Sequence, residues 1–145
     1  MAHVPPPLVA LLAAGAQRLL APAAPAGTAR RVLAGFVAAG SASLAGGTAR
    51  RFRAAGTTVD PTKPARASTL VTDGPNALTR NPMYAGLAGL LVAHAVLRGG
   101  WRTWVPVAGF VVVVDRLQVR FEEEALRARF GQEYDDYCAR VRRWI

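Results

Sequence analysis

Two short groups of polar residues carry the side-chain types that could bind a ligand or take part in a reaction. The first is RNPMY at residues 80–84, which follows the turn sequence DGPN at residues 73–76. Gly tolerates positive φ and Pro fixes φ, so the chain is predicted to turn just before Arg80. A guanidinium at this place can bind a carboxylate, and an amide can bind other polar groups.

The RNPMY group also stands at the predicted start of an apolar helix. Asn81 can cap free N–H groups, and Pro82 suits the first helical position because no N–H partner is lost there. Apart from His94, interpreted as a hydrogen-bonded packing residue, the residues as far as Leu97 are apolar or small. Arg80 and Asn81 are therefore expected beside the positive end of a helix dipole, which favours an anionic or polar ligand group.

The second group is RFEEE at residues 120–124, where the last apolar run ends. Glu122 and Glu123 differ by about 100° around a helix, so at least one of them can face inward. On spacing alone, a solvated helix start in which Glu123 pairs with Arg127 is the simpler interpretation. The alternative is a ligand-binding carboxylate at the end of an apolar helix.

Composition favours a small membrane protein of one domain, residues 1–145. The chain has 145 residues, of which 52% are hydrophobic and 19% charged, and its mean hydropathy is +0.20. Such a composition departs from that of an ordinary soluble domain. The net charge of +9 does not indicate nucleic-acid binding, because the basic residues flank apolar runs and do not alternate with aromatics. The sequence also contains no recognised metal-binding or nucleotide-binding motif, so no metal is expected.

The apolar runs predict an all-α membrane protein with about four transmembrane helices, at residues 4–20, 32–47, 82–97 and 104–119. The last three are short for a crossing of about 20 residues, so they must extend through their flanks or thin the bilayer. Small residues in the second run would let helix backbones approach closely; they are Gly35, Ala39, Gly40, Ser43 and Gly46.

Arginines concentrate in residues 48–81 and beyond residue 119. This bias places both ends of the chain in the cytoplasm, with the protein in a bacterial inner (plasma) membrane. The charged residues 120–145 form an amphipathic pattern with Gly131 as a predicted interruption. They are expected to form a helical lid over the cytoplasmic end of the bundle.

Three pieces of the sequence together resemble a known family: GTTVDPTKPA (56–65), LVTDGPNALTRNPMYAGL (70–87) and DRLQVRFEEEALRARFGQEYDDYCARVRRWI (115–145). They are similar to the integral-membrane methyltransferases grouped with isoprenylcysteine carboxyl methyltransferase and phosphatidylethanolamine N-methyltransferase. The resemblance implies an enzyme that uses S-adenosylmethionine, with this cofactor held between the last helices and the cytoplasmic tail. It nominates six cofactor-binding residues: Arg80, Asn81, Tyr84, Gly86, Glu122 and Glu123. The turn residue Gly74 is a further cofactor-binding candidate, and Arg80 and Arg120 are the catalytic candidates.

The resemblance leaves the methyl acceptor open. The isoprenylcysteine enzymes usually have His before the Pro, whereas this chain has Asn81. An isoprenylcysteine-like carboxylate, a phospholipid amine and a small thiol all remain candidates, and the acceptor is expected to enter from the bilayer. Membrane lipids are the other expected partners, and the oligomeric state is left open.

The residue types suit this chemistry, because an already activated methyl donor mainly requires alignment. Glu122 or Glu123 can receive the ribose hydroxyls or the amino group, and Arg80 or Arg120 can bind the carboxylate. The alternative from a different class is a non-catalytic membrane scaffold with a basic, lipid-binding tail.

Overall fold

The computed structural model describes residues 5–21, 25–57 and 67–145, and every regular element among them is a helix. Most of the expected GTTVDPTKPA piece, residues 58–65, lies outside the described residues. The elements in chain order are α1 (Pro6–Leu20), α2 (Thr28–Ala54), η2 (Gly74–Ala77), α3 (Pro82–Arg98), η3 (Trp101–Trp104), α4 (Val105–Val113), η4 (Val114–Val119), α5 (Arg120–Phe130) and α6 (Gln132–Arg140).

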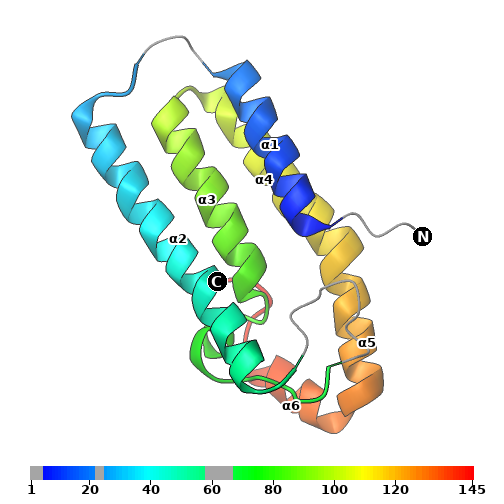
Figure 1. Ribbon diagram of the computed structural model, residues 1–145. Coiled ribbons are helices and arrows are strands. Elements are labelled where there is room, and N and C mark those ends of the chain that lie inside the picture. The colour runs from blue at the N-terminus through cyan, green and yellow to red at the C-terminus, as the bar shows by residue number, and fades with distance from the viewer. Residues whose placement is uncertain (1–4, 22–24, 58–66) are drawn as a thin grey trace.

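The helices form a bundle with α3 at its centre (Figure 1). α3 contacts α1, α2 and α4, and α1 also packs on α4. The core joins the apolar faces of α3 and α4, with Leu91, Ala95, Phe110 and Val114 among its most buried members. α6 folds back beneath the bundle from the lower end of α5.

α4, η4 and α5 make one continuous helix, because the backbone stays helical at Val114 and at Arg120. The middle portion, η4, has π-helical hydrogen bonding. Such segments occur frequently at functional sites. The apolar run expected at residues 104–119 therefore continues without a break into the charged helical residues that follow it. A change from apolar to charged side chains alters what surrounds a helix, but it does not break the backbone.

α2 and α3 approach closely because α3 has glycines where the two helices meet. A Cβ atom built on Gly86 would lie 2.8 Å from the Cβ atom of Ala45 and 2.8 Å from the carbonyl oxygen of Ser41. Gly89 faces the side chain of the same Ser41. The small residues that were expected to mediate close packing mostly lie elsewhere. Apart from the backbone of α2 itself, no atom of the described residues lies within 4 Å of a Cβ built on Gly35, Gly40 or Gly46.

The all-helical class is confirmed, and so is the interruption at Gly131, where φ is +52° between α5 and α6. Pro82 occupies the start of α3 as predicted. Among the described helices, α2 alone is long and apolar enough to cross a membrane, with a mean hydropathy of 1.4 over its best window. A membrane crossing by the other apolar helices stays a prediction.

Candidate functional site

A cavity of about 120 Å³ lies at the end of the bundle where α2, the start of α3, α5 and α6 meet. Both sequence groups contribute to its wall. Arg80, Asn81 and Tyr84 line it from the start of α3, and Glu122 and Glu123 line it from α5. The continuous α4–α5 helix makes this possible, because it carries the two carboxylates past the end of the apolar bundle and over the start of α3.

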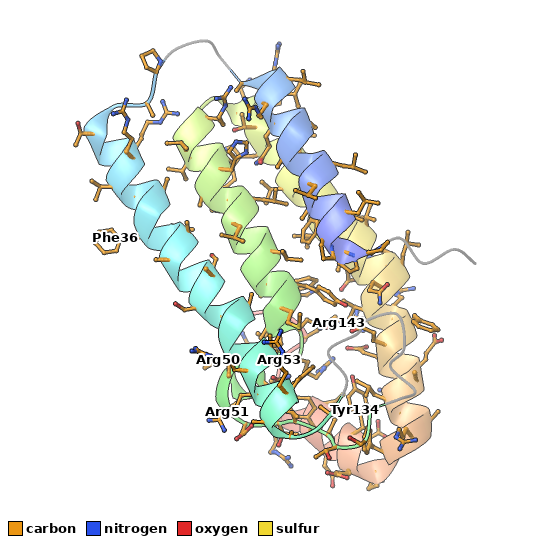
Figure 2. The ribbon with its side chains drawn as sticks, viewed as in Figure 1. Phe36, Arg50, Arg51, Arg53, Tyr134 and Arg143 are labelled. Atoms are coloured by element: carbon orange, nitrogen blue, oxygen red, sulfur yellow. The ribbon has the colours of Figure 1, made fainter. Side chains whose placement is uncertain are left out.

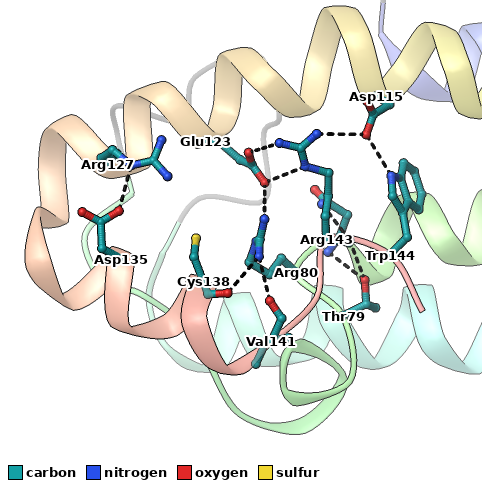
Figure 3. Close-up of polar contacts among 11 residues, drawn as sticks. Thr79, Arg80, Asp115, Glu123, Arg127, Asp135, Cys138, Val141, Arg143 and Trp144 are labelled. Atoms are coloured by element: carbon teal, nitrogen blue, oxygen red, sulfur yellow. Dashed lines mark hydrogen bonds and ion pairs between the residues drawn. The ribbon is translucent and has the colours of Figure 1, made fainter.

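Glu123 is buried and forms ion pairs with two guanidinium groups (Figure 3). Arg143 donates from Nε to Oε1 at 3.0 Å and from Nη2 to Oε2 at 2.6 Å, while Arg80 Nη2 donates to Oε1 at 2.8 Å. Burial alone would raise the pKa of Glu123, but the hydrogen bonds from Arg143 and Arg80 outweigh it and hold this pKa below its ordinary value. The expected pairing of Glu123 with Arg127 is wrong, since Arg127 pairs with Asp135 at 2.8 Å.

The Arg80 guanidinium makes several hydrogen bonds, but its Nε makes none to a described residue. Its Nη1 donates to the carbonyl oxygen of Val141 at 2.7 Å and to that of Cys138 at 3.3 Å. Its Nε is buried and has no hydrogen-bond partner within the described part of the chain. A buried donor without a partner is costly, so a ligand acceptor at this atom would be stabilising.

Glu122 is bound by neutral groups instead of cations. The Tyr84 hydroxyl and Gln118 Nε2 both donate to its Oε1, the latter at 2.7 Å. Burial raises the pKa of Glu122 to about 7, and the two hydrogen bonds oppose this rise only in part. Within the described ranges Glu122 belongs to no ion pair. It is therefore the cavity carboxylate that is available to a cationic or hydrogen-bond-donating ligand.

Asn76 is a cavity residue that sequence reasoning treated only as part of a turn. It lies in η2, its side chain lines the cavity and only 4% of the residue is exposed. Its Oδ1 has no hydrogen-bond partner in the described structure, while its backbone carbonyl accepts from the Tyr137 hydroxyl at 2.6 Å. The DGPN turn indicated where the backbone bends, but no local signal showed that this amide would be buried.

Three of the nominated residues do not reach the cavity. Gly86 packs against α2, and Gly74 is an exposed turn residue with φ +58° beside the Arg51 side chain. Arg120 is exposed, because it lies two positions before Glu122 and therefore about 200° around the helix. Asn81 does line the cavity, but its expected side-chain cap is not formed. Its amide donates instead to the carbonyl oxygen of Arg143 at 3.1 Å.

A second buried polar cluster joins α1, α3 and η3 and does not line this cavity. Gln17 Nε2 donates to the carbonyl oxygens of Leu91 and Thr103, each at 2.9 Å, which leaves its Oε1 2.8 Å from His94 Nδ1. Since Oε1 can only accept, Nδ1 must carry the proton. His94 is thus a hydrogen-bonded packing residue, as the sequence interpretation expected.

The fold and the site define a helical-bundle protein with a cavity, lined by both polar and apolar residues, at one end of an apolar core. No protein-family model matches the chain, and no solved structure matches it. An uncharacterized protein of Haemophilus influenzae (strain ATCC 51907 / DSM 11121 / KW20 / Rd) is 36% identical over 63 residues, which are 43% of this chain and 100% of that protein. The chain belongs to the same family as that protein, whose name states no activity.

Proposed function

We propose that this protein is an S-adenosylmethionine-dependent methyltransferase that acts on a lipophilic acceptor at a membrane surface. One observation carries the proposal: the RNPMY group and the Glu122–Glu123 pair, which are far apart in the sequence, line the same cavity. The resemblance described above rests on these same residues in combination. A binding site made from both halves of that pattern is what such an enzyme requires.

The unused polar atoms of the cavity suit the groups of this cofactor. Arg80 Nε is a buried donor that lacks an acceptor, and Asn76 Oδ1 is a buried acceptor that lacks a donor. A carboxylate satisfies the first, and an amino group or a hydroxyl satisfies the second. Glu122, whose pKa is about 7 without a ligand, adds a carboxyl group whose ionised form a nearby positive sulfonium favours.

The cavity is smaller than the whole cofactor needs. Its 120 Å³ compares with about 300–1,000 Å³ for typical small-molecule sites. Binding must therefore widen it. Ala67, Thr69, Leu70 and Val71 form part of its wall outside the helices, and a segment without helical hydrogen bonds is the part of a wall that moves at least cost.

When bound, the cofactor supplies a methyl group attached to a positively charged sulfur. A lone pair of the acceptor forms a bond to the methyl carbon as the carbon–sulfur bond breaks. The residues of this chain then have to orient and shield the reactants. Arg80 is the donor for an anionic end of the ligand. Tyr84 and Gln118 hold the Glu122 carboxylate in place, and the buried Tyr134 and Tyr137 close the cavity from α6.

A membrane location fits the surface of the bundle. Only 11% of the most apolar window of α2 is buried, and Phe36 on this helix is 75% exposed and points away from the other helices (Figure 2). At the cavity end of α2, Figure 2 shows Arg50, Arg51 and Arg53. This end of α2 has three arginines and the other end has two, Arg30 and Arg31. An excess of arginines favours the cytoplasmic side, so we place the cavity there and all four apolar helices in the bilayer.

The test is the thermal stability of the purified protein in detergent, with and without S-adenosylmethionine or S-adenosylhomocysteine. A ligand that binds the folded state raises Tm by mass action. We expect a rise in the wild type and a much smaller rise in Glu122→Gln. The matched control is Glu124→Gln, because Glu124 is the exposed neighbour in the same helix.

A rise that is equal in all three proteins would contradict the assigned site. No rise in a folded wild type would contradict the enzyme and favour the scaffold alternative. If the cofactor binds, a methyl-transfer assay on membrane extracts distinguishes a carboxylate acceptor from an amine or thiol acceptor, because a methyl ester is labile to base and N-methyl and S-methyl products are not.

A further inference from the structure

Residues 141–145, here called the strap, lie across the segment that leads into α3. The backbone N–H of Arg80 donates to the carbonyl oxygen of Arg142 at 2.9 Å. Thr79 Oγ1 and Asn81 Nδ2 both donate to the carbonyl oxygen of Arg143, at 2.9 and 3.1 Å. Each residue from 79 to 81 therefore makes at least one hydrogen bond to the strap backbone.

Side chains of the strap tie it to the continuous α4–α5 helix on the other side. Arg143 binds both oxygens of Glu123, and its Nη1 lies 3.4 Å from Asp115 Oδ1. Trp144 Nε1 donates to the same Asp115 oxygen at 2.9 Å (Figure 3). The strap thus holds the start of α3 next to the two carboxylates of α5 that line the cavity.

Arg143 and Arg80 share Glu123 unequally. Arg143 makes two hydrogen bonds, from Nε and Nη2, whereas Arg80 makes one, from Nη2. Because Arg143 occupies both carboxylate oxygens, Arg80 cannot form its own paired contact with Glu123. Paired contacts of this kind are the preferred arrangement of arginine and a carboxylate, so Glu123 would attract Arg80 Nε if Arg143 were absent.

We propose that Arg143 is a positioning residue of the cavity: by occupying Glu123 it keeps the Nε of Arg80 free for a ligand. The inference rests on the proposed function and extends it to a residue outside the two sequence groups. Arg80 touches the ligand, and Arg143 acts only through Glu123. Its side chain, 34% exposed, is not among the residues that line the cavity.

The experiment measures the affinity for S-adenosylhomocysteine by calorimetry in detergent. We expect Arg143→Gln to weaken binding about tenfold, which is the effect of losing one hydrogen bond to a charged group. Arg142→Gln is the matched control, since it removes the same charge from the strap at an exposed side chain and leaves the backbone contacts in place. Its affinity should stay within about twofold of the wild type. Arg143→Lys, which keeps the charge, should recover part of the loss.

A double-mutant cycle separates positioning from a general loss of structure. In a Glu123→Gln background the competitor for Arg80 is gone, so Arg143→Gln should have no further effect on affinity. An equal loss in both backgrounds would overturn the inference, as would unchanged affinity in a folded Arg143→Gln or Arg143→Lys protein. Absence of binding to the wild type would instead overturn the proposed function, and the inference with it.

Discussion

Arg143 and Glu123 form a two-bond ion pair, with 3.0 Å between Nε and Oε1 and 2.6 Å between Nη2 and Oε2. The Glu123 side chain is 10% exposed. It also forms an ion pair with Arg80, whose side chain is 13% exposed. One carboxylate therefore forms ion pairs with two guanidinium groups in a largely buried place. Removing that carboxylate leaves both cations without their main partner.

We predict that Glu123→Gln lowers the free energy of unfolding by about 3 kcal/mol, the lower end of the range for breaking a buried ion pair, because Arg143 is partly exposed. The measurement is denaturant unfolding in detergent without a ligand. The neighbouring Glu124→Gln is the control, and a change within about 0.5 kcal/mol is expected for it. Similar losses in the two variants would show that the Glu123 cluster adds nothing beyond surface charge.

Much of the helical architecture could be predicted, because apolar runs and boundary residues act locally. Pro82 starts α3 and Gly131 separates α5 from α6, as their backbone preferences require. The extent of α2 was underestimated, since the arginines that follow its apolar part continue the same helix. The continuation of α4 into α5 was missed for the same reason: polarity patterns report the surroundings of a helix and not the end of its hydrogen bonding.

The lining of the cavity was predicted in part, while a role in ligand binding stays a prediction. Arg80, Tyr84 and Glu122 line it, and they were nominated because the two polar groups stood out at the ends of apolar runs and matched the family resemblance. Asn76 and Arg143 were not assigned a role, because each depends on a turn or strap brought against a distant helix. Burial of a polar side chain is a property of that tertiary arrangement, which no local pattern reports.

Gly86 gives a second prediction, on the packing of α2 against α3. A methyl group at this position would lie 2.8 Å from the Ala45 Cβ atom and from the Ser41 carbonyl oxygen. Gly86→Ala should therefore destabilise the protein by about 1–3 kcal/mol through overpacking. Gly35→Ala on α2 meets no atom within 4 Å and should be neutral or stabilising by up to about 1 kcal/mol. Thermal unfolding of both variants tests this, and an unaffected Gly86→Ala would mean that the helices separate at no cost.

The raised pKa of Glu122 predicts a pH dependence of stability. Between pH 4.5 and about 7, the Glu122 carboxyl is protonated in the folded protein and ionised in the unfolded chain. Because the folded state binds more protons in this window, the contribution of Glu122 to stability is fully present below pH 4.5 and is lost as pH rises through about 7. The contribution of Glu123 has the opposite sign, since its pKa is lowered, and it is lost only at acid pH.

Comparing Glu122→Gln with the wild type isolates this effect, because the other carboxyl groups are common to both. The stability of the variant relative to the wild type should grow by an amount on the order of 3 kcal/mol as pH rises through the window. Unfolding experiments across the pH range measure it. A difference that does not change with pH would contradict the burial of an ionisable Glu122.

Asn76 gives the last prediction, in which stability and binding move in opposite directions. Its Oδ1 is buried without a partner among the described residues. Removing this unpaired polar atom recovers its desolvation cost, which offsets the loss of the amide contact with Tyr137. Asn76→Leu should therefore unfold at the same or a higher temperature than the wild type when no ligand is present. The rise in Tm caused by S-adenosylhomocysteine should be largely lost, because the ligand donor no longer has an acceptor.

Tyr137→Phe is the matched control for Asn76→Leu. It removes the 2.6 Å hydrogen bond to the backbone carbonyl of Asn76 but keeps the amide side chain in the cavity. We expect it to lower stability by about 1 kcal/mol and to retain a ligand-dependent rise in Tm. If Asn76→Leu were instead strongly destabilised and still responded fully to the ligand, the Asn76 amide would be a structural group and not part of the binding site.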